Sequence, residues 1–233
     1  MFCLGCTRFR GLNCSQRRPA GARRGCLPAR CGSSRRSGEH RPLANAEPAL
    51  LLAQLKKGNL VVFMRHGETG PAYADRATAV MGDCATQRNL NAEGRAQNAE
   101  MALALKALAV PVGKVWSSEF CRSWQTAEAL FGPQGYTVTA ALSVPPSYPS
   151  VNAADAAANN SYLRAMLADK PPAGTNTWLV SHGVNVQLAT GYHPDEQGEI
   201  VLFRPDGKGA FTRLGSIEPK DWKRLVARAA LAR

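Results

Sequence analysis

Two histidines stand in the same local context, each directly after an apolar run and directly before a glycine. They are His66 and His182, and Arg65 immediately precedes the first of them. Arg122 follows a third run that contains apolar residues. Histidine can act as a nucleophile or a proton carrier near neutral pH, and the planar fork of arginine binds two phosphate oxygens at once. Brought together, these four side chains would form a dense binding site for an anion such as phosphate.

The four side chains can meet only if the segments that carry them end at one edge of a sheet. Apolar and β-branched residues predict strands in three segments, which are Val61–Met64, Lys114–Ser118 and Thr177–Ser181. Ser118 is a suitable N-cap for a helix over residues 119–131, which places Arg122 in the first turn of that helix. Because open α/β sheets bind ligands at the carboxyl ends of their strands, we expect the histidines and this helix N-terminus to share one crevice.

Strands and helices alternate along the chain. Helices are predicted at 48–57, 96–108, 119–131, 184–190 and 220–233, and further strands at 136–144, 199–204 and 210–214. Prolines at positions 145, 146 and 149 predict a loop over residues 145–160, followed by one or two helical turns. The alternation predicts an α/β fold, a three-layer sandwich with a mostly parallel central sheet flanked by helices.

The net charge of +12 belongs mostly to one end of the chain. Residues 1–42 contain ten arginines and a single acidic residue, Glu39, whereas the rest of the chain carries 19 basic and 16 acidic residues. We therefore expect no nucleic-acid partner for the nearly balanced remainder. Residues 1–46 are predicted to be a basic, disordered tail, a targeting segment or the product of a mis-assigned start, and residues 47–233 to be the folded domain.

Seven cysteines are divided between the same two regions. Five lie in residues 1–42 without the paired spacing of a zinc site, and Cys84 and Cys121 lie in the domain. The latter two could pair in an exported protein or stay reduced in the cytosol, so a cytoplasmic and an exported (periplasmic) location both stay open. No apolar run reaches the roughly 18 residues that span a membrane, so no membrane span is expected.

Four blocks of the sequence, in the right order, resemble the histidine phosphatase superfamily of phosphoglycerate-mutase-like proteins. The blocks are Arg65-His66-Gly67, Gln87–Gln97, Ser117–Arg122 with Thr126-Ala127, and Ser181-His182-Gly183. The resemblance covers residues 58–204 and implies that His66 is the nucleophile that becomes a phosphohistidine. It also implies that Arg65, Arg122 and His182 bind the phosphate, and that the reaction needs no metal ion or cofactor.

The proton donor for the leaving alcohol is the part of the family pattern that this sequence matches least. Mutase-like members use a glutamate some distance after the first Arg-His-Gly, and the corresponding residues here, 145–160, contain only Asp155. Glu119 and Glu199 are the other candidates, although Glu119 could simply favour its helix N-terminus. We expect Glu199, because it opens the strand after the His182 helix and would face the site if that strand runs antiparallel.

Together these features predict a phosphatase of the small phosphatase branch, which hydrolyses phosphate monoesters through a phosphohistidine on His66. Phosphoglycerate mutase-type transfer is an alternative, although the chain is short where mutases carry the insertion that closes over their substrate. A non-catalytic phosphate-binding regulatory module is a second alternative. The substrate is expected to be a phosphorylated small molecule, such as a sugar phosphate or a lipopolysaccharide heptose phosphate, or a phosphohistidine on a protein. The spacing of the motifs does not choose among them.

Overall fold

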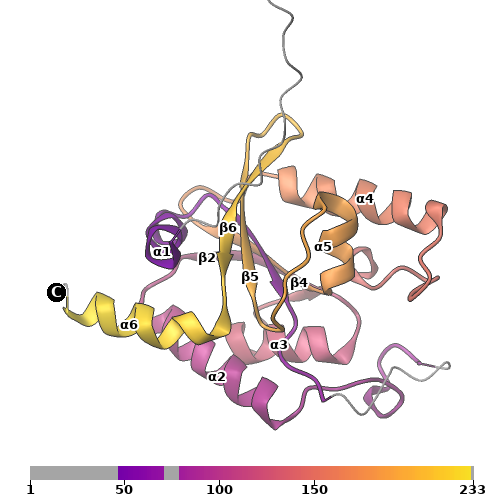
Figure 1. Cartoon of the computed structure of the whole chain (residues 1–233), viewed down its shortest axis with the longest axis horizontal. Coiled ribbons are helices and arrows are strands. Elements are labelled where there is room, and N and C mark those ends of the chain that lie inside the picture. The colour runs from indigo at the N-terminus through magenta and orange to yellow at the C-terminus, as the bar shows by residue number, and fades with distance from the viewer. Residues whose placement is uncertain (1–46, 71–78, 232–233) are drawn as a thin grey trace, which may run out of the picture. The chain divides into compact units, whose positions relative to one another are not determined.

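The computed structural model describes residues 47–70 and 79–231. The predicted tail over residues 1–46 lies outside the described residues, and the domain boundary at residue 47 stays a prediction. The described residues form alternating helices and strands, which begin with α1 (Pro48–Lys57) and end with α6 (Trp222–Leu231), as Figure 1 shows.

One six-stranded sheet runs through the domain, in the order β3-β2-β4-β1-β5-β6. Its strands are β1 (Val61–Arg65), β2 (Val112–Ser117), β3 (Thr137–Val138), β4 (Asn176–Ser181), β5 (Ile200–Pro205) and β6 (Phe211–Ile217). The first four strands in that order pair in parallel, while β5 runs antiparallel to both of its neighbours, β1 and β6. The predicted mostly parallel sheet is confirmed, with β4 and β1 side by side at its centre.

Helices cover both faces of this sheet (Figure 1). The remaining four are α2 (Ala92–Ala107), α3 (Cys121–Phe131), α4 (Ala153–Ala168) and α5 (Gly183–Thr190). On one face, α1, α2, α3 and α6 share a core with Val62, Met64 and Trp178. On the other face, α4 and α5 share a core with Phe63 and Leu179. Successive residues of β1 thus enter opposite cores, which explains why the strand is apolar throughout and confirms the predicted three-layer sandwich.

The starts of α2 and α3 position two blocks of the predicted site. Asn91 caps α2 as its side chain accepts a hydrogen bond from the Gly94 amide at 2.7 Å. The predicted cap of α3 is wrong, because that helix begins at Cys121 with Phe120 as its N-cap. Ser118 lies in the preceding turn, where its hydroxyl accepts a hydrogen bond from the Phe120 amide at 3.2 Å.

The predicted strand over 136–144 and the predicted loop over 145–160 both differ from the structure. The strand shrinks to the two residues of β3, and a long helix, α4, begins inside the predicted loop. Asn152 caps this helix by accepting a hydrogen bond from the Asp155 amide at 2.9 Å. The prolines end at position 149, and the alanine-rich residues beyond them favour a helix whose leucines, Leu163 and Leu167, reach the core.

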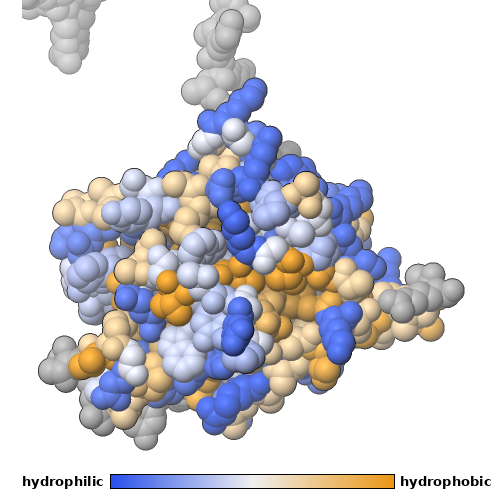
Figure 2. Space-filling model, turned by 180° about the vertical axis from the view of Figure 1, so that it is seen from behind, coloured by the Kyte–Doolittle hydropathy of each residue, from blue (hydrophilic) through white to orange (hydrophobic). Residues whose placement is uncertain are grey.

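The surface of the domain mixes polar and apolar residues, and apolar ones gather near the middle of the face in Figure 2. Isolated exposed apolar side chains, such as Leu103 on α2, are ordinary for a folded domain. None of the helices within residues 47–70 and 79–231 is long and apolar enough to cross a membrane.

Candidate active site

The two histidines follow the two central strands of the sheet. β1 and β4 pair in parallel with Arg65 opposite Ser181, so His66 and His182 leave the sheet at the same point of its carboxyl edge. The His66 amide donates a hydrogen bond to the Ser181 carbonyl at 3.0 Å. The two ring centroids lie 5.3 Å apart, edge to face, and both side chains are buried. The structure therefore brings the two histidines together at the expected edge.

The hydrogen bonds of His66 determine which ring nitrogen is available for chemistry. Nδ1 lies 2.9 Å from the carbonyl oxygen of Gly67, which can only accept, so Nδ1 carries the hydrogen. Nε2 of the neutral ring then carries the lone pair. The amide of Gly67 in turn donates to Oγ1 of Thr126 on α3 at 3.0 Å. A side chain at Gly67 would collide with Asn98, since a Cβ there would lie 2.6 Å from its Oδ1.

The two arginines predicted for the site, Arg65 before the first histidine and Arg122 between the two histidines, are held by different contacts. Arg65 donates from Nη1 to the carbonyls of Pro194 and Asp195, at 2.9 and 3.1 Å. Arg122 is the second residue of α3 and is only 1% exposed. Its guanidinium carbon lies 4.5 Å from the ring centroid of Phe120, a cation–π contact. The arginine of the sheet edge and the arginine of the helix thus reach one site from different elements.

Burial and positive charge keep both histidines neutral. Burial lowers the pKa of His66 well below 6.5, and the charge of Arg122 lowers it further. The pKa of His182 is lowered well below 6.5 for the same two reasons, again with burial first. A neutral imidazole retains the lone pair that a nucleophile needs. The positive charge of the arginines can therefore attract an anion, and it also favours the neutral form of both histidines.

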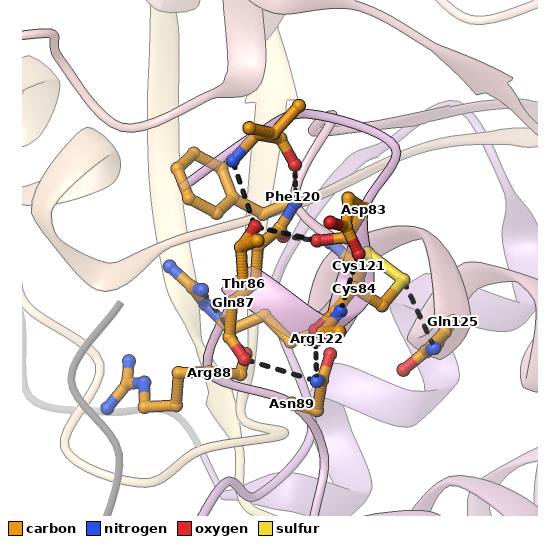
Figure 3. Close-up of a disulfide and its surroundings, with 12 residues drawn as sticks. Asp83, Cys84, Thr86, Gln87, Arg88, Asn89, Phe120, Cys121, Arg122 and Gln125 are labelled. Atoms are coloured by element: carbon orange, nitrogen blue, oxygen red, sulfur yellow. Dashed lines mark hydrogen bonds between the residues drawn. A yellow bond between two sulfur atoms is a disulfide. The ribbon is translucent and has the colours of Figure 1, made fainter. Parts of the chain in front are cut away.

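Arg88 is a further cation of the site that the sequence analysis did not assign. Its charge lowers the pKa of both histidines, and after burial it is the main cause of the lowered pKa of Arg65. Arg122 donates to the Arg88 carbonyl at 3.4 Å, and Figure 3 shows both side chains extending to the same side of the loop. The sequence indicates Arg88 only by its position inside Gln87–Gln97, one of the four blocks that resemble the family pattern.

A disulfide joins the loop that carries Arg88 to the helix that carries Arg122. Cys84 and Cys121 are bonded, which answers a question that the sequence left open (Figure 3). Next to this bond, Gln87 accepts a hydrogen bond from the Cys121 amide at 2.9 Å. The loop is therefore attached to the first turn of α3 by a disulfide and by hydrogen bonds to Gln87 and to the Arg88 carbonyl.

Glu199 lies at the same sheet edge, because β5 runs antiparallel to β1 and the Arg65 amide donates to the Glu199 carbonyl. Its carboxylate, however, has partners within its own loop. Oε1 accepts from the Tyr192 hydroxyl at 2.6 Å, and Oε2 accepts from the Glu196 amide at 3.2 Å. Burial and then the bond to Glu199 raise the pKa of Tyr192 to about 12. The role of Glu199 as general acid stays a prediction.

A cavity of about 1300 Å³ adjoins these residues. Arg88, Phe120 and Glu119 line it, together with Tyr148 and Asp155. Phe120 also packs edge to face on His182, with 5.1 Å between the ring centroids, so the cavity begins beside the buried histidines. Among residues 47–70 and 79–231, no three His, Cys, Asp or Glu side chains gather as they would around a metal ion.

Comparison with known proteins agrees with this geometry. Residues 61–142 match the model of the histidine phosphatase superfamily, branch 1. The structure of the protein histidine phosphatase SixA complexed with tungstate is 22% identical, covers 70% of this chain and 98% of its own, and has a TM-score of 0.50. A structure from Escherichia coli str. K-12 substr. MG1655 is provisionally named as an alpha-ribazole-5'-P phosphatase. It is 14% identical, covers 70% of this chain and 98% of its own, and has a TM-score of 0.52. No curated protein sequence matches the chain.

The two structural similarities show a shared fold. The matched segment starts at β1 and contains Arg65, His66 and Arg122, and the second histidine lies beyond it at the neighbouring strand end. Over residues 61–142 the chain is thus similar to the histidine phosphatase superfamily, branch 1.

Proposed function

We propose that the domain is a phosphatase that hydrolyses phosphate monoesters through a phosphohistidine on His66. The observation that carries this proposal is the state of His66, a buried and neutral imidazole whose Nδ1 is bonded to the Gly67 carbonyl. Its Nε2 lone pair lies among arginines that would attract a phosphate ester. A nucleophile that is neutral at pH 7 and surrounded by cations suits attack on a dianion, because it adds no repulsive charge.

The remaining residues of the site bind and neutralise the phosphoryl group in this mechanism. Arg65 and Arg122 hold its non-bridging oxygens, and His182 contacts it from the neighbouring strand end. Arg88 adds positive charge at the side of the cavity. Since phosphoryl transfer requires mainly positioning and compensation of charge, cations fixed in a buried site supply most of the catalysis. Water then attacks the phosphohistidine, which releases phosphate and restores His66.

The leaving group occupies the cavity beside Arg88 and Phe120 in this proposal. A volume of about 1300 Å³ accommodates a small phosphorylated metabolite as well as part of a phosphoprotein. The two fold relatives are named for a phosphatase of protein histidine and one of alpha-ribazole-5'-P, so both kinds of substrate belong in a first panel.

The test is hydrolysis of p-nitrophenyl phosphate by the full chain and by its His66→Ala variant. We expect the variant to lose about 10⁴-fold or more in kcat, because no other group replaces the nucleophile. His193→Ala is the matched control, because His193 is the exposed third histidine of residues 47–233. In a second measurement, the enzyme reacts with a ³²P-labelled substrate and the reaction is stopped without acid. A label on the protein that is labile in acid and stable in base should then appear on wild type and not on His66→Ala. Equal rates for wild type and His66→Ala on every phosphate ester would overturn the proposal.

A further inference from the structure

Three carboxylates compete for the role of proton donor to the leaving oxygen, and their hydrogen bonds separate them. Both oxygens of Glu199 are occupied, by Tyr192 and by the Glu196 amide. Asp155 lines the cavity, but its Oδ2 accepts from the Ser147 amide at 2.9 Å and from Asn152 at 3.3 Å. Its carboxylate therefore holds the turn before α4 in place.

Glu119 differs from both of these acids in that hydroxyl groups connect its carboxylate with His182. It is half-buried, lines the cavity, and its Oε2 accepts a hydrogen bond from the Ser143 hydroxyl at 3.0 Å. Its other oxygen, Oε1, makes no hydrogen bond to any residue in the described part of the chain. One oxygen thus fixes the carboxyl group, and the other is available to a molecule in the cavity.

A row of hydroxyl groups connects Glu119 with the buried site. The Ser143 hydroxyl oxygen lies 3.4 Å from that of Ser118, which in turn lies 2.9 Å from Nε2 of His182. The amides of Glu119 and Phe120 also donate to these two hydroxyls, each at 3.2 Å. Two loops and one strand end therefore hold the carboxyl group at a set position relative to His182.

The lengths of these contacts indicate how the hydrogens of the row are arranged. Each hydroxyl has a single hydrogen, and Ser143 donates its own to Glu119. Ser118 lies closer to Nε2 of His182, at 2.9 Å, than to Ser143, at 3.4 Å, so its hydrogen is donated to Nε2. The neutral His182 ring then carries its hydrogen on Nδ1, which has no hydrogen bond to any described residue and can donate to a phosphoryl oxygen.

We propose that Glu119 is the general acid and base of the reaction, an inference that rests on the proposed phosphatase function. In the first step, Nε2 of His66 forms a bond to phosphorus while the bond to the leaving oxygen breaks. The Glu119 carboxyl proton moves to that oxygen, so the alcohol leaves neutral. In the second step, water attacks phosphorus and its proton passes to the Glu119 carboxylate. The nitrogen–phosphorus bond breaks, its electron pair returns to His66, and both residues regain their starting states.

This role predicts a loss that depends on the basicity of the leaving group. The nitrophenolate of p-nitrophenyl phosphate leaves without a proton, whereas the more basic phenolate of phenyl phosphate gains from one. The two esters have nearly the same shape, so recognition differs little between them. For Glu119→Gln we expect kcat/KM to fall about 10²-fold or more with phenyl phosphate, and less than about fivefold with p-nitrophenyl phosphate.

Two comparison variants and one supporting variant complete the test. Glu199→Gln and Asp155→Asn are expected to affect both esters equally. Ser143→Ala removes the hydrogen bond that orients Glu119, so a smaller loss with the same preference for phenyl phosphate is expected, and it replaces Glu119→Gln if that variant fails to fold. Equal losses with both esters in Glu119→Gln, or a selective loss in Glu199→Gln, would overturn this inference alone. Wild type no faster than His66→Ala with both esters would overturn the proposed function and this inference together.

Discussion

The histidine side and the arginine side of the site are built in different ways. His66 and His182 follow β1 and β4, two neighbouring central strands that are buried between both helical layers. Arg122 and Arg88 instead come from a helix start and from a loop beyond the sheet edge. The most buried part of the fold therefore determines the position of His66, the proposed nucleophile.

The arginine side relies on specific local contacts instead. The disulfide and the hydrogen bond from the Cys121 amide to Gln87 attach the loop to α3. Thr126 connects the two sides, since its hydroxyl accepts from the Gly67 amide at 3.0 Å and donates to the Arg122 carbonyl at 2.7 Å. The core of the fold thus positions the two histidines, whereas cross-links at its edge position the two arginines.

The largest effect is expected on the histidine side. His182→Asn removes the proposed contact to the phosphoryl group at a position where the buried backbone cannot move to compensate, so kcat/KM with p-nitrophenyl phosphate should fall about 10³-fold. His193→Asn is the control and should retain activity. A loss of less than tenfold in His182→Asn would show that the second strand end contributes little to catalysis.

On the arginine side, Arg122→Lys keeps the positive charge but loses the planar fork. We expect kcat/KM to fall about 10²-fold, because a lysine ammonium cannot bind two phosphate oxygens in the same geometry. The matched control is Arg224→Lys, which changes a surface pair with Asp221. If kcat/KM fell as much in Arg122→Lys as in His182→Asn, the two sides of the site would depend equally on exact geometry. The proposed difference between the histidine side and the arginine side would then be wrong.

Removal of the disulfide tests the cross-link itself. For the double variant Cys84→Ser/Cys121→Ser we expect about a tenfold loss in kcat/KM, mostly through KM, because Arg88 and Arg122 lose their fixed spacing. The bond closes a loop with a sequence separation of 37, so its loss should cost about 4 kcal/mol and lower Tm by about 10 °C. Dithiothreitol should reproduce both changes in wild type and leave the double variant unchanged; full activity of the reduced wild type would contradict this.

The smallest effect is a pH dependence of stability that arises on the histidine side. Folding lowers the pKa of His66 and His182, so below about pH 6.5 the unfolded chain binds more protons than the folded one. Stability should therefore fall as pH drops below 6.5 and gain nothing from these groups above pH 7. Thermal melts at pH 7.5 and 5.5 should show a smaller decrease for the double variant His66→Asn/His182→Asn than for wild type. An identical decrease would mean that other groups control it.

The elements that carry the histidines could be predicted from sequence because strands buried on both faces are apolar without interruption. The start of α4 cannot be predicted from the sequence with the same certainty, because it depends on the Asn152 cap, a short-range signal close to three prolines. Arg88 and the pairing of Cys84 with Cys121 depend on a loop that folds against α3, which no spacing along the chain encodes. The same reason applies to the acids: position along the chain favours Glu199, and only the three-dimensional partners of Glu119 and Glu199 distinguish the two.

The bond between Cys84 and Cys121 also closes a ring of chain that contains all of α2 and β2. A protease cut at any peptide bond inside this ring leaves the two fragments covalently joined. The fragment that ends before the cut keeps His66, and the fragment that follows it keeps His182, so both halves of the site stay attached to each other. The domain can thus be nicked without being divided, and the cut becomes visible on a gel only after reduction.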